Sequence, residues 1–145
     1  MGGMETNPVS ILIIEEHPLM RESLYTAISE EPDLKIVEPS PGDENAFKLT
    51  ISSQHDVLFL VHKPDIILFS LGNPGLEDLN ALNNLRKKLR DTPILALTRD
   101  EVPGQEQAAL EHGAHAVLTK AASREELLGA LRMVKENSQI AHHFE

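Results

Sequence analysis

The segment Pro64-Asp-Ile-Ile-Leu-Phe-Ser-Leu-Gly-Asn-Pro-Gly75 decides how the rest of the chain is interpreted. Its residues Ile66 to Phe69 carry no charge, which is typical of a strand buried on both faces of a parallel sheet. The turn residues Gly72 to Gly75 follow directly and predict a loop. In a doubly wound sheet, ligands bind beyond the carboxyl ends of the strands. Ser70, at the end of this strand, is therefore predicted to face the functional site.

Length and composition narrow the classes of function. The 145 residues suffice for one domain with a core of its own. With 23 acidic and 13 basic residues the formal net charge is −10, so this domain is not expected to bind the phosphate backbone of a nucleic acid. The chain has no cysteine, which excludes disulfides and thiolate metal sites and suits a cytoplasmic protein. No apolar run approaches the ~18 residues of a membrane span.

Strand-like and helix-like segments alternate along the chain. Besides the segment around Ile66, apolar and β-branched runs predict four strands, at Ser10–Ile14, Leu34–Val37, Pro93–Thr98 and Ala116–Thr119. Four helices are also predicted. One begins at Pro18 and a second carries a stripe of leucines from Leu79 to Leu89. A third covers Gln105–His112 and ends at a capping Gly113, and a fourth follows a capping box of Ser123 and Glu126. Residues 43–61 predict either one long helix or a helix with a broken second piece.

This alternation predicts the fold class. Five strands and five helices in turn indicate an α/β domain, a doubly wound parallel sheet with right-handed crossovers and helices on both faces. We expect the folded domain to cover residues 9–136, with a disordered segment at 1–8 and a C-terminal tail at 137–145. Because parallel strands end at one edge of the sheet, that edge should collect the residues that follow four of the strands, namely Glu15, Glu16, Ser70, Thr98 and Lys120.

From Ser10 to Val134 the chain resembles the receiver domain of bacterial two-component response regulators, in particular the branch that precedes LuxR-type helix-turn-helix domains. Four motifs, in the family's order, carry the resemblance. Ile11–Arg21 is similar to the family's first strand with its His-Pro, and Pro64–Gly75 is similar to the strand that bears the phosphoacceptor. Leu97-Thr98 matches the hydroxyl residue of the family's switch, and Leu118–Lys120 matches the segment that ends in its lysine. It implies a flavodoxin-like (βα)5 fold with strand order 2-1-3-4-5.

The chain departs from the family at the residues that carry its chemistry. Ser70 occupies the place of the aspartate that takes a phosphoryl group from a histidine kinase, and a serine supplies neither that nucleophile nor a charge for Mg²⁺. Glu15 and Glu16 replace a pair of aspartates, and Val117 replaces a Tyr or Phe that moves on activation. We therefore expect a pseudo-receiver without Asp phosphorylation, with no cofactor and with weak or absent Mg²⁺ binding, for which Glu16 is the one candidate ligand.

Two expectations concern the interior of this vestigial pocket. With one carboxylate fewer, Glu15, Glu16 and Lys120 are nearer to charge balance, so the pocket should be stable without a metal. Ser70 is expected to be a small polar residue that forms a hydrogen bond inside the pocket. Thr98 and Lys120 are expected to bond either to Glu16 or to each other.

Several functions are compatible with the sequence. The first is a non-enzymatic signalling module that binds protein partners, or a second copy of itself, through the face of the fourth helix, fifth strand and fifth helix, where the resemblance places Gln105, His112, Val117 and Arg132. The second is the receiver half of a LuxR-type transcription regulator whose DNA-binding domain lies beyond Glu145.

The sequence disfavours two further classes, an enzyme and a cofactor binder. A Mg²⁺-dependent phosphatase or phosphotransferase would need an aspartate where Ser70 lies. A flavodoxin-like cofactor binder would need a phosphate-binding loop after the first strand, and Glu15 and Glu16 would repel phosphate there. We therefore predict that the domain is not an enzyme.

Overall fold

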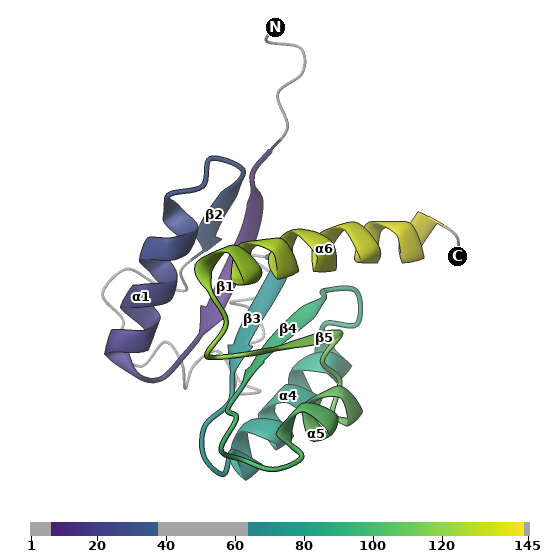
Figure 1. Cartoon of the computed structure of the whole chain (residues 1–145). Coiled ribbons are helices and arrows are strands. Elements are labelled where there is room, and N and C mark those ends of the chain that lie inside the picture. The colour runs from purple at the N-terminus through teal and green to yellow at the C-terminus, as the bar shows by residue number, and fades with distance from the viewer. Residues whose placement is uncertain (1–6, 38–63, 144–145) are drawn as a thin grey trace, which may run out of the picture.

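A computed structural model describes residues 7–37 and 64–143, which form one sheet with helices around it (Figure 1). The elements in chain order are β1 (Val9–Ile14), α1 (Pro18–Ser29), β2 (Leu34–Val37), β3 (Ile66–Ser70), α4 (Leu76–Lys88), β4 (Ile94–Thr98), α5 (Gln105–Glu111), β5 (Ala116–Thr119) and α6 (Arg124–His143). The helix predicted within residues 43–61 lies outside the described residues, so the helices predicted as fourth and fifth are α5 and α6.

The sheet has five strands in the order β2-β1-β3-β4-β5, and each neighbouring pair is parallel. This confirms the predicted fold class and strand order. The chain leaves β2 at one edge and returns as β3 on the other side of β1, so the topology reverses between β1 and β3. All five strands end at the same edge, which is where a doubly wound sheet binds ligands.

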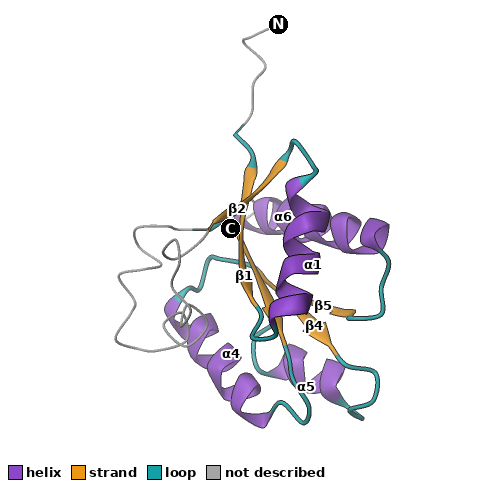
Figure 2. Ribbon diagram, turned by 90° about the vertical axis from the view of Figure 1, so that its left-hand side faces the viewer, coloured by secondary structure: helices purple, strands orange, loops and turns teal. Residues whose placement is uncertain are grey.

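Helices cover both faces of the sheet (Figure 2). Alternate strand residues point to opposite faces, so each uncharged strand contributes to two separate clusters of buried side chains. One face packs against α1 and α6, through residues such as Ile28 and Leu131. The other packs against α4 and α5, through residues such as Leu82 and Ala109.

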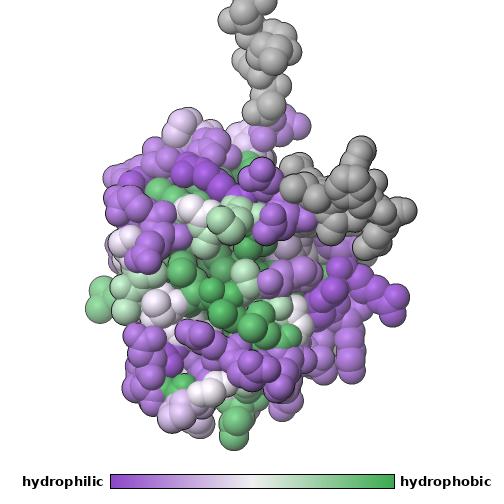
Figure 3. All heavy atoms as spheres, turned by 45° about the vertical axis from the view of Figure 1, so that its right-hand side comes forward, coloured by the Kyte–Doolittle hydropathy of each residue, from purple (hydrophilic) through white to green (hydrophobic). Residues whose placement is uncertain are grey.

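The strand β5 lies at the open edge of the sheet between α5 and α6. All four of its residues are half-buried, whereas every residue of β3 and β4 is buried. Of the two helices that flank β5 in sequence, α5 carries Leu110, which is 45% exposed, and α6 carries Met133, which is 62% exposed. Figure 3 turns this side of the molecule forward and shows apolar side chains gathered within a polar surround. We call this surface the α5–β5–α6 face.

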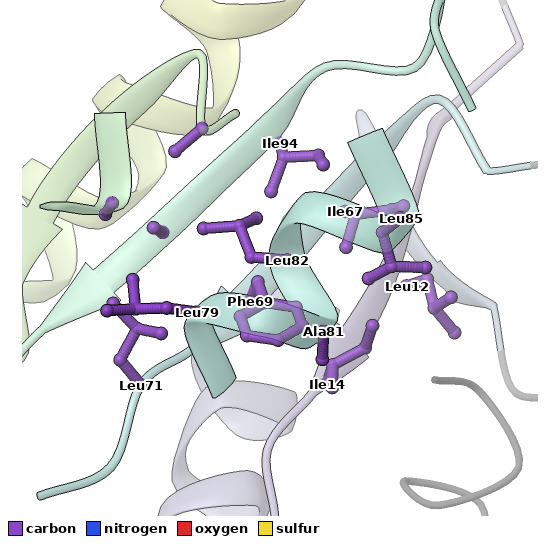
Figure 4. Packing of buried hydrophobic residues seen from close by; sticks show 13 residues of the cluster. Leu12, Ile14, Ile67, Phe69, Leu71, Leu79, Ala81, Leu82, Leu85 and Ile94 are labelled. Atoms are coloured by element: carbon purple, nitrogen blue, oxygen red, sulfur yellow. The ribbon is translucent and has the colours of Figure 1, made fainter. Parts of the chain in front are cut away.

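Figure 4 shows the cluster of buried side chains on the α4 side of the sheet, which explains why the strands are apolar throughout. Phe69, in the middle of β3, has no exposed surface and lies among Ile14 of β1 and Leu79 and Leu82 of α4. A continuous hydrophobic run is required because both faces of a central parallel strand are covered. Burial of this cluster holds the end of β3, and with it Ser70, in place.

Two helix ends follow the sequence prediction. The N–H of Glu126 donates to Ser123 Oγ (3.1 Å) and the N–H of Ser123 donates to Glu126 Oε1 (2.9 Å), which confirms the capping box. After α5, Gly113 has φ of 119°, and the next N–H, of Ala114, donates to the carbonyl of Ala109 (3.0 Å), which closes the helix as predicted. The helix α6 continues through residues 137–143, where the apolar pattern predicted no element.

In the part of the chain that the structure describes, none of the helices combines the length and the apolar character that a bilayer crossing requires. The longest, α6, has 20 residues and carries acidic side chains in its first turn.

His115 is expected to make the stability of the domain depend on pH between about 8 and 5. Its Nδ1 accepts a hydrogen bond from the N–H of Ile94 (3.0 Å), which only the unprotonated nitrogen can do. Burial and then the nearby Arg86 charge lower the pKa of His115 from its ordinary value of 6.5. The unfolded chain therefore binds more protons below that value, so the stabilising contribution is present above pH 6.5 and is lost as the pH falls through and below it.

The check is thermal unfolding of wild type and His115→Gln over this pH range. Carboxylates titrate in both proteins, so the difference between the two melting curves isolates His115. That difference should shrink on acidification, and parallel pH profiles would contradict the assignment.

Candidate functional site

Glu15 is the buried carboxylate of the site, one residue beyond the end of β1, with 2% of its surface exposed. Its Oε2 accepts a hydrogen bond from the N–H of His17 (2.9 Å) and lies 3.2 Å from His17 Nδ1. Its Oε1 lies 3.9 Å from Lys120 Nζ and forms no hydrogen bond with any described residue. The carboxylate is thus held by the backbone and ring of His17 and by one ammonium group at a long distance.

The two acidic residues predicted at this edge do not act together. Glu16 is exposed, because adjacent residues at the end of a strand point in opposite directions, and Glu15 takes the inward position. The pairing expected between Lys120 and Glu16 is therefore wrong, since the ion pair that forms joins Lys120 to Glu15. The expected link between Thr98 and Lys120 exists only in the backbone, where the N–H of Lys120 donates to the carbonyl of Thr98 (2.8 Å).

Ser70 ends β3 and is 6% exposed. In the register of β1 and β3, Ile14 lies opposite Phe69, so Glu15 and Ser70 are the next residues along the two strands. Ser70 Oγ forms no hydrogen bond with any described residue, so the hydrogen bond predicted for it is not formed there. Two buried polar atoms at neighbouring strand ends, Ser70 Oγ and Glu15 Oε1, thus lack a hydrogen-bond partner among the described residues.

Lys120 follows β5, with 17% of its side chain exposed. Burial lowers the pKa of its ammonium group, and the attraction of Glu15 opposes that shift. Thr98, at the end of β4, is 1% exposed and lies deeper than Lys120. Val117 is half-buried on β5 and packs against the core cluster on the α4 side.

A pocket of about 380 Å³ opens at this edge. It is lined by residues after β1, β4 and β5, namely Glu15, His17, Met20, Arg99, Asp100, Glu101, Thr119, Lys120 and Ala121. Of the five residues predicted for the site, only Glu15 and Lys120 line it, while the buried Ser70 and Thr98 and the exposed Glu16 do not. Among the described residues, no group of three His, Asp or Glu side chains is placed to hold a metal ion.

The loop after β4 supplies a wall that the sequence reasoning missed. Thr119 Oγ1 donates to Asp100 Oδ1 (2.8 Å) and accepts from the N–H of Ala121 (3.1 Å), so the loop after β4 is joined to the end of β5 by two residues that line the pocket. The only available signal was position, because Asp100 and Thr119 are close in sequence to Thr98 and Lys120. Nothing in the residue types themselves indicates that they pair.

Comparison with known proteins identifies the family of the chain. The family model described as response regulator receiver domain matches residues 11–132. The nitrate/nitrite response regulator NarL of Escherichia coli K12 is 29% identical over 133 residues, which are 92% of this chain and 57% of that protein, so the chain spans little more than half of this relative.

Two solved structures show the same fold. A LuxR-family two-component response regulator from Aurantimonas sp. SI85-9A1 superposes with a TM-score of 0.69 at 21% identity, over 90% of this chain and 87% of that one. The receiver domain of the sensor histidine kinase PA1611 from Pseudomonas aeruginosa PAO1 was solved with a magnesium ion in its active site cleft. It superposes with a TM-score of 0.65 at 20% identity, over 89% of this chain and 98% of that one. Because the family model matches residues 11–132, which are most of the chain, the chain belongs to the response regulator receiver domain family.

Proposed function

We propose that this receiver domain is a pseudo-receiver, which signals through protein contacts and is not switched by phosphorylation of an aspartate. One observation carries the proposal: Ser70, a neutral hydroxyl, ends β3 next in register to the buried Glu15, on the strand that resembles the family's phosphoacceptor strand. A receiver needs a carboxylate there to attack phosphorus and to hold Mg²⁺. Ser70 lacks that charge, and no base forms a hydrogen bond with its Oγ among the described residues.

The residues of the site also fit Mg²⁺ poorly. This ion prefers several oxygen ligands in close octahedral geometry. Glu15, the buried carboxylate, faces the Lys120 ammonium with one oxygen and the His17 N–H with the other, while Glu16 is exposed. In the described part of the chain no third acidic side chain completes a cluster. We therefore derive no step that uses a metal, and the domain is proposed not to be an enzyme.

The α5–β5–α6 face is the proposed contact surface for a protein partner or a second copy of the chain. It is supported by the half-buried edge strand β5 and by the exposed Leu110 and Met133 on either side of it. Apolar side chains that are exposed together on a polar surface often mark protein contacts. In this proposal the partner acts on the domain in the cytoplasm, and the state of the face does not depend on phosphate.

A second function is favoured by the length of the relatives. NarL is matched over 57% of its length, so the chain is equally compatible with the receiver half of a LuxR-type transcription regulator. The reading frame of the whole gene, and DNA binding by its complete product, would test this. The two proposals are compatible, because a pseudo-receiver can also control an attached output domain.

The test compares wild type with Ser70→Asp after addition of Mg²⁺ with acetyl phosphate or with beryllofluoride. We expect no change in the ¹H–¹⁵N spectrum or the oligomeric state of wild type, because it lacks the acceptor carboxylate. Ser70→Asn, which has the size of aspartate without its charge, is the matched control and should also stay silent. NMR is the suitable readout, because the chain has no tryptophan and a single tyrosine.

A Mg²⁺-dependent response of wild type would refute the pseudo-receiver proposal. A response of Ser70→Asp alone would identify Ser70 as the decisive change. A silent Ser70→Asp would mean that Glu15, Glu16 and Val117 contribute to the loss as well.

A further inference from the structure

Gln105 is a buried polar residue that neither the pocket nor the core accounts for. It is the first residue of α5 and is 3% exposed. Its Oε1 accepts from the N–H of Arg99 (2.6 Å), and its Nε2 donates to the carbonyls of Gly72 (2.8 Å) and Pro74 (3.4 Å). A buried carboxamide is costly unless its donors and acceptor are all used, and here both ends of the group are bonded.

These contacts join three parts of the chain that are distant in sequence. Gly72 and Pro74 belong to the loop between β3 and α4, directly after Ser70, and Arg99 begins the loop between β4 and α5. Gln105 thereby connects the loop after β3, the loop after β4 that lines the pocket, and the helix α5. Because α5 is one side of the α5–β5–α6 face, the same side chain links the site to that face.

The space for this carboxamide depends on Gly75. A Cβ atom at Gly75 would lie 2.8 Å from the Gly72 carbonyl oxygen and 3.0 Å from Gln105 Nε2. Gly75 also has φ of 80°, which disfavours any residue with a side chain. On the other side of the loop, Asp78 Oδ2 accepts from the N–H of Gly72 (2.8 Å), so both polar backbone groups of Gly72 are bonded to side chains.

The geometry points to Gln105 as a positioning residue that locks α5 to the loops after β3 and β4, so that the α5–β5–α6 face keeps one shape whatever occupies the pocket. Three hydrogen bonds within the chain do this, and none of them involves Glu15, Ser70 or Lys120. The consequence for partner binding rests on the proposed function. The hydrogen bonds of Gln105 do not depend on that proposal, because they are present in the unliganded domain.

Amide hydrogen exchange measured by NMR tests the lock residue by residue. The Arg99 amide reports the acceptor end of the carboxamide, and the Gly72 amide reports whether the loop after β3 stays in place. In Gln105→Leu both amides should exchange about fivefold faster or more, since one lost hydrogen bond corresponds to roughly 1 kcal/mol. In Gln105→Glu the carboxylate still accepts from Arg99 but donates nothing, so only Gly72 should accelerate.

The matched control is Gln107→Leu. Gln107 lies on the same helix and is exposed, and its Nε2 bonds only to the Glu111 side chain among the described groups. This variant removes the same chemical group without touching either loop, so both reporter amides should keep their wild-type rates. The α5 amide signals should shift in Gln105→Leu and not in the control.

Three outcomes would overturn the lock. The first is that the Arg99 and Gly72 amides of Gln105→Leu exchange at wild-type rates. The second is that these two rates are the same in Gln105→Leu and Gln105→Glu. The third is that exchange accelerates evenly over the β1 and β3 amides, which would indicate a general loss of stability. If Gln105→Leu does not fold, Gln105→Glu alone decides through its Arg99 and Gly72 rates. Failure here leaves the phosphorylation test untouched, so the two proposals can fail separately.

Discussion

Replacement of Lys120 with methionine is expected to lower the free energy of unfolding by about 3 kcal/mol, because it leaves Glu15 buried without a countercharge. Glu15 is 2% exposed, and its Oε1 has Lys120 Nζ at 3.9 Å as its charged neighbour but no hydrogen bond to a described residue. Methionine keeps most of the length of the lysine stem, so the loss reports charge and not packing. Urea unfolding followed by circular dichroism measures it.

Two further variants measure how much the Glu15 charge and the Glu15–Lys120 pair each contribute to the free energy of unfolding. Glu15→Gln keeps an acceptor for the His17 N–H and removes the buried charge, so it should cost only about 1 kcal/mol. In the combined variant with Lys120→Met, the loss should be smaller than the sum of the single losses, because the second change removes the charge that the first one stranded.

Lys135→Met is the matched control. Lys135 Nζ lies 3.3 Å from Asp65 Oδ1, with 27% and 39% of the two side chains exposed, and an exposed pair contributes less than about 1 kcal/mol. A Lys120→Met loss no larger than that of Lys135→Met would show that Glu15 does not depend on Lys120.

Ser70→Asp is expected to lower the free energy of unfolding by about 3 kcal/mol when Mg²⁺ is absent. The new carboxylate would lie at a position that is 6% exposed, next in register to Glu15, so it is both desolvated and repelled. Ser70→Asn has the same shape and no charge, so the difference between the two variants measures the electrostatic part. Urea unfolding in the presence of a chelator is the measurement.

Ser70→Ala provides the opposite expectation. The Ser70 hydroxyl is buried and bonds to no described residue, so its removal should raise the free energy of unfolding by about 1 kcal/mol. If Ser70→Asp proves as stable as Ser70→Asn, the site tolerates a second carboxylate, and the expectation that one carboxylate fewer stabilises the metal-free pocket is wrong.

The elements and their order were predictable because the controlling signals are local. Ile66 to Phe69 had to be a buried strand, since an uncharged run between turn residues has few other solutions. The Ser123 capping box and the Gly113 helix end depend on residues within one helical turn. The convergence of Glu15, Ser70, Thr98 and Lys120 at one edge follows from parallel strands, which all end on the same side.

The pairings within the site were not predictable in the same way. Glu15 and Glu16 are identical in type and adjacent, and only the register of β1 against β3 decides which one is buried. The hydrogen bond expected for Ser70 is not formed with any described residue, and its partner was not predictable because a partner depends on distances between strands and not on residue type.

By itself the sequence determined the receiver fold, the edge that carries the site, and the neutral hydroxyl at the end of β3, because strand periodicity and turn chemistry act over a few residues. Only the tertiary structure decided that Lys120 faces Glu15 and that Gln105, not Gln107, is buried between two loops. Those contacts join residues on different strands and loops, so they exist only once the sheet has brought distant parts of the chain together. Long-range packing, which leaves no local pattern, selects among residues that are chemically alike.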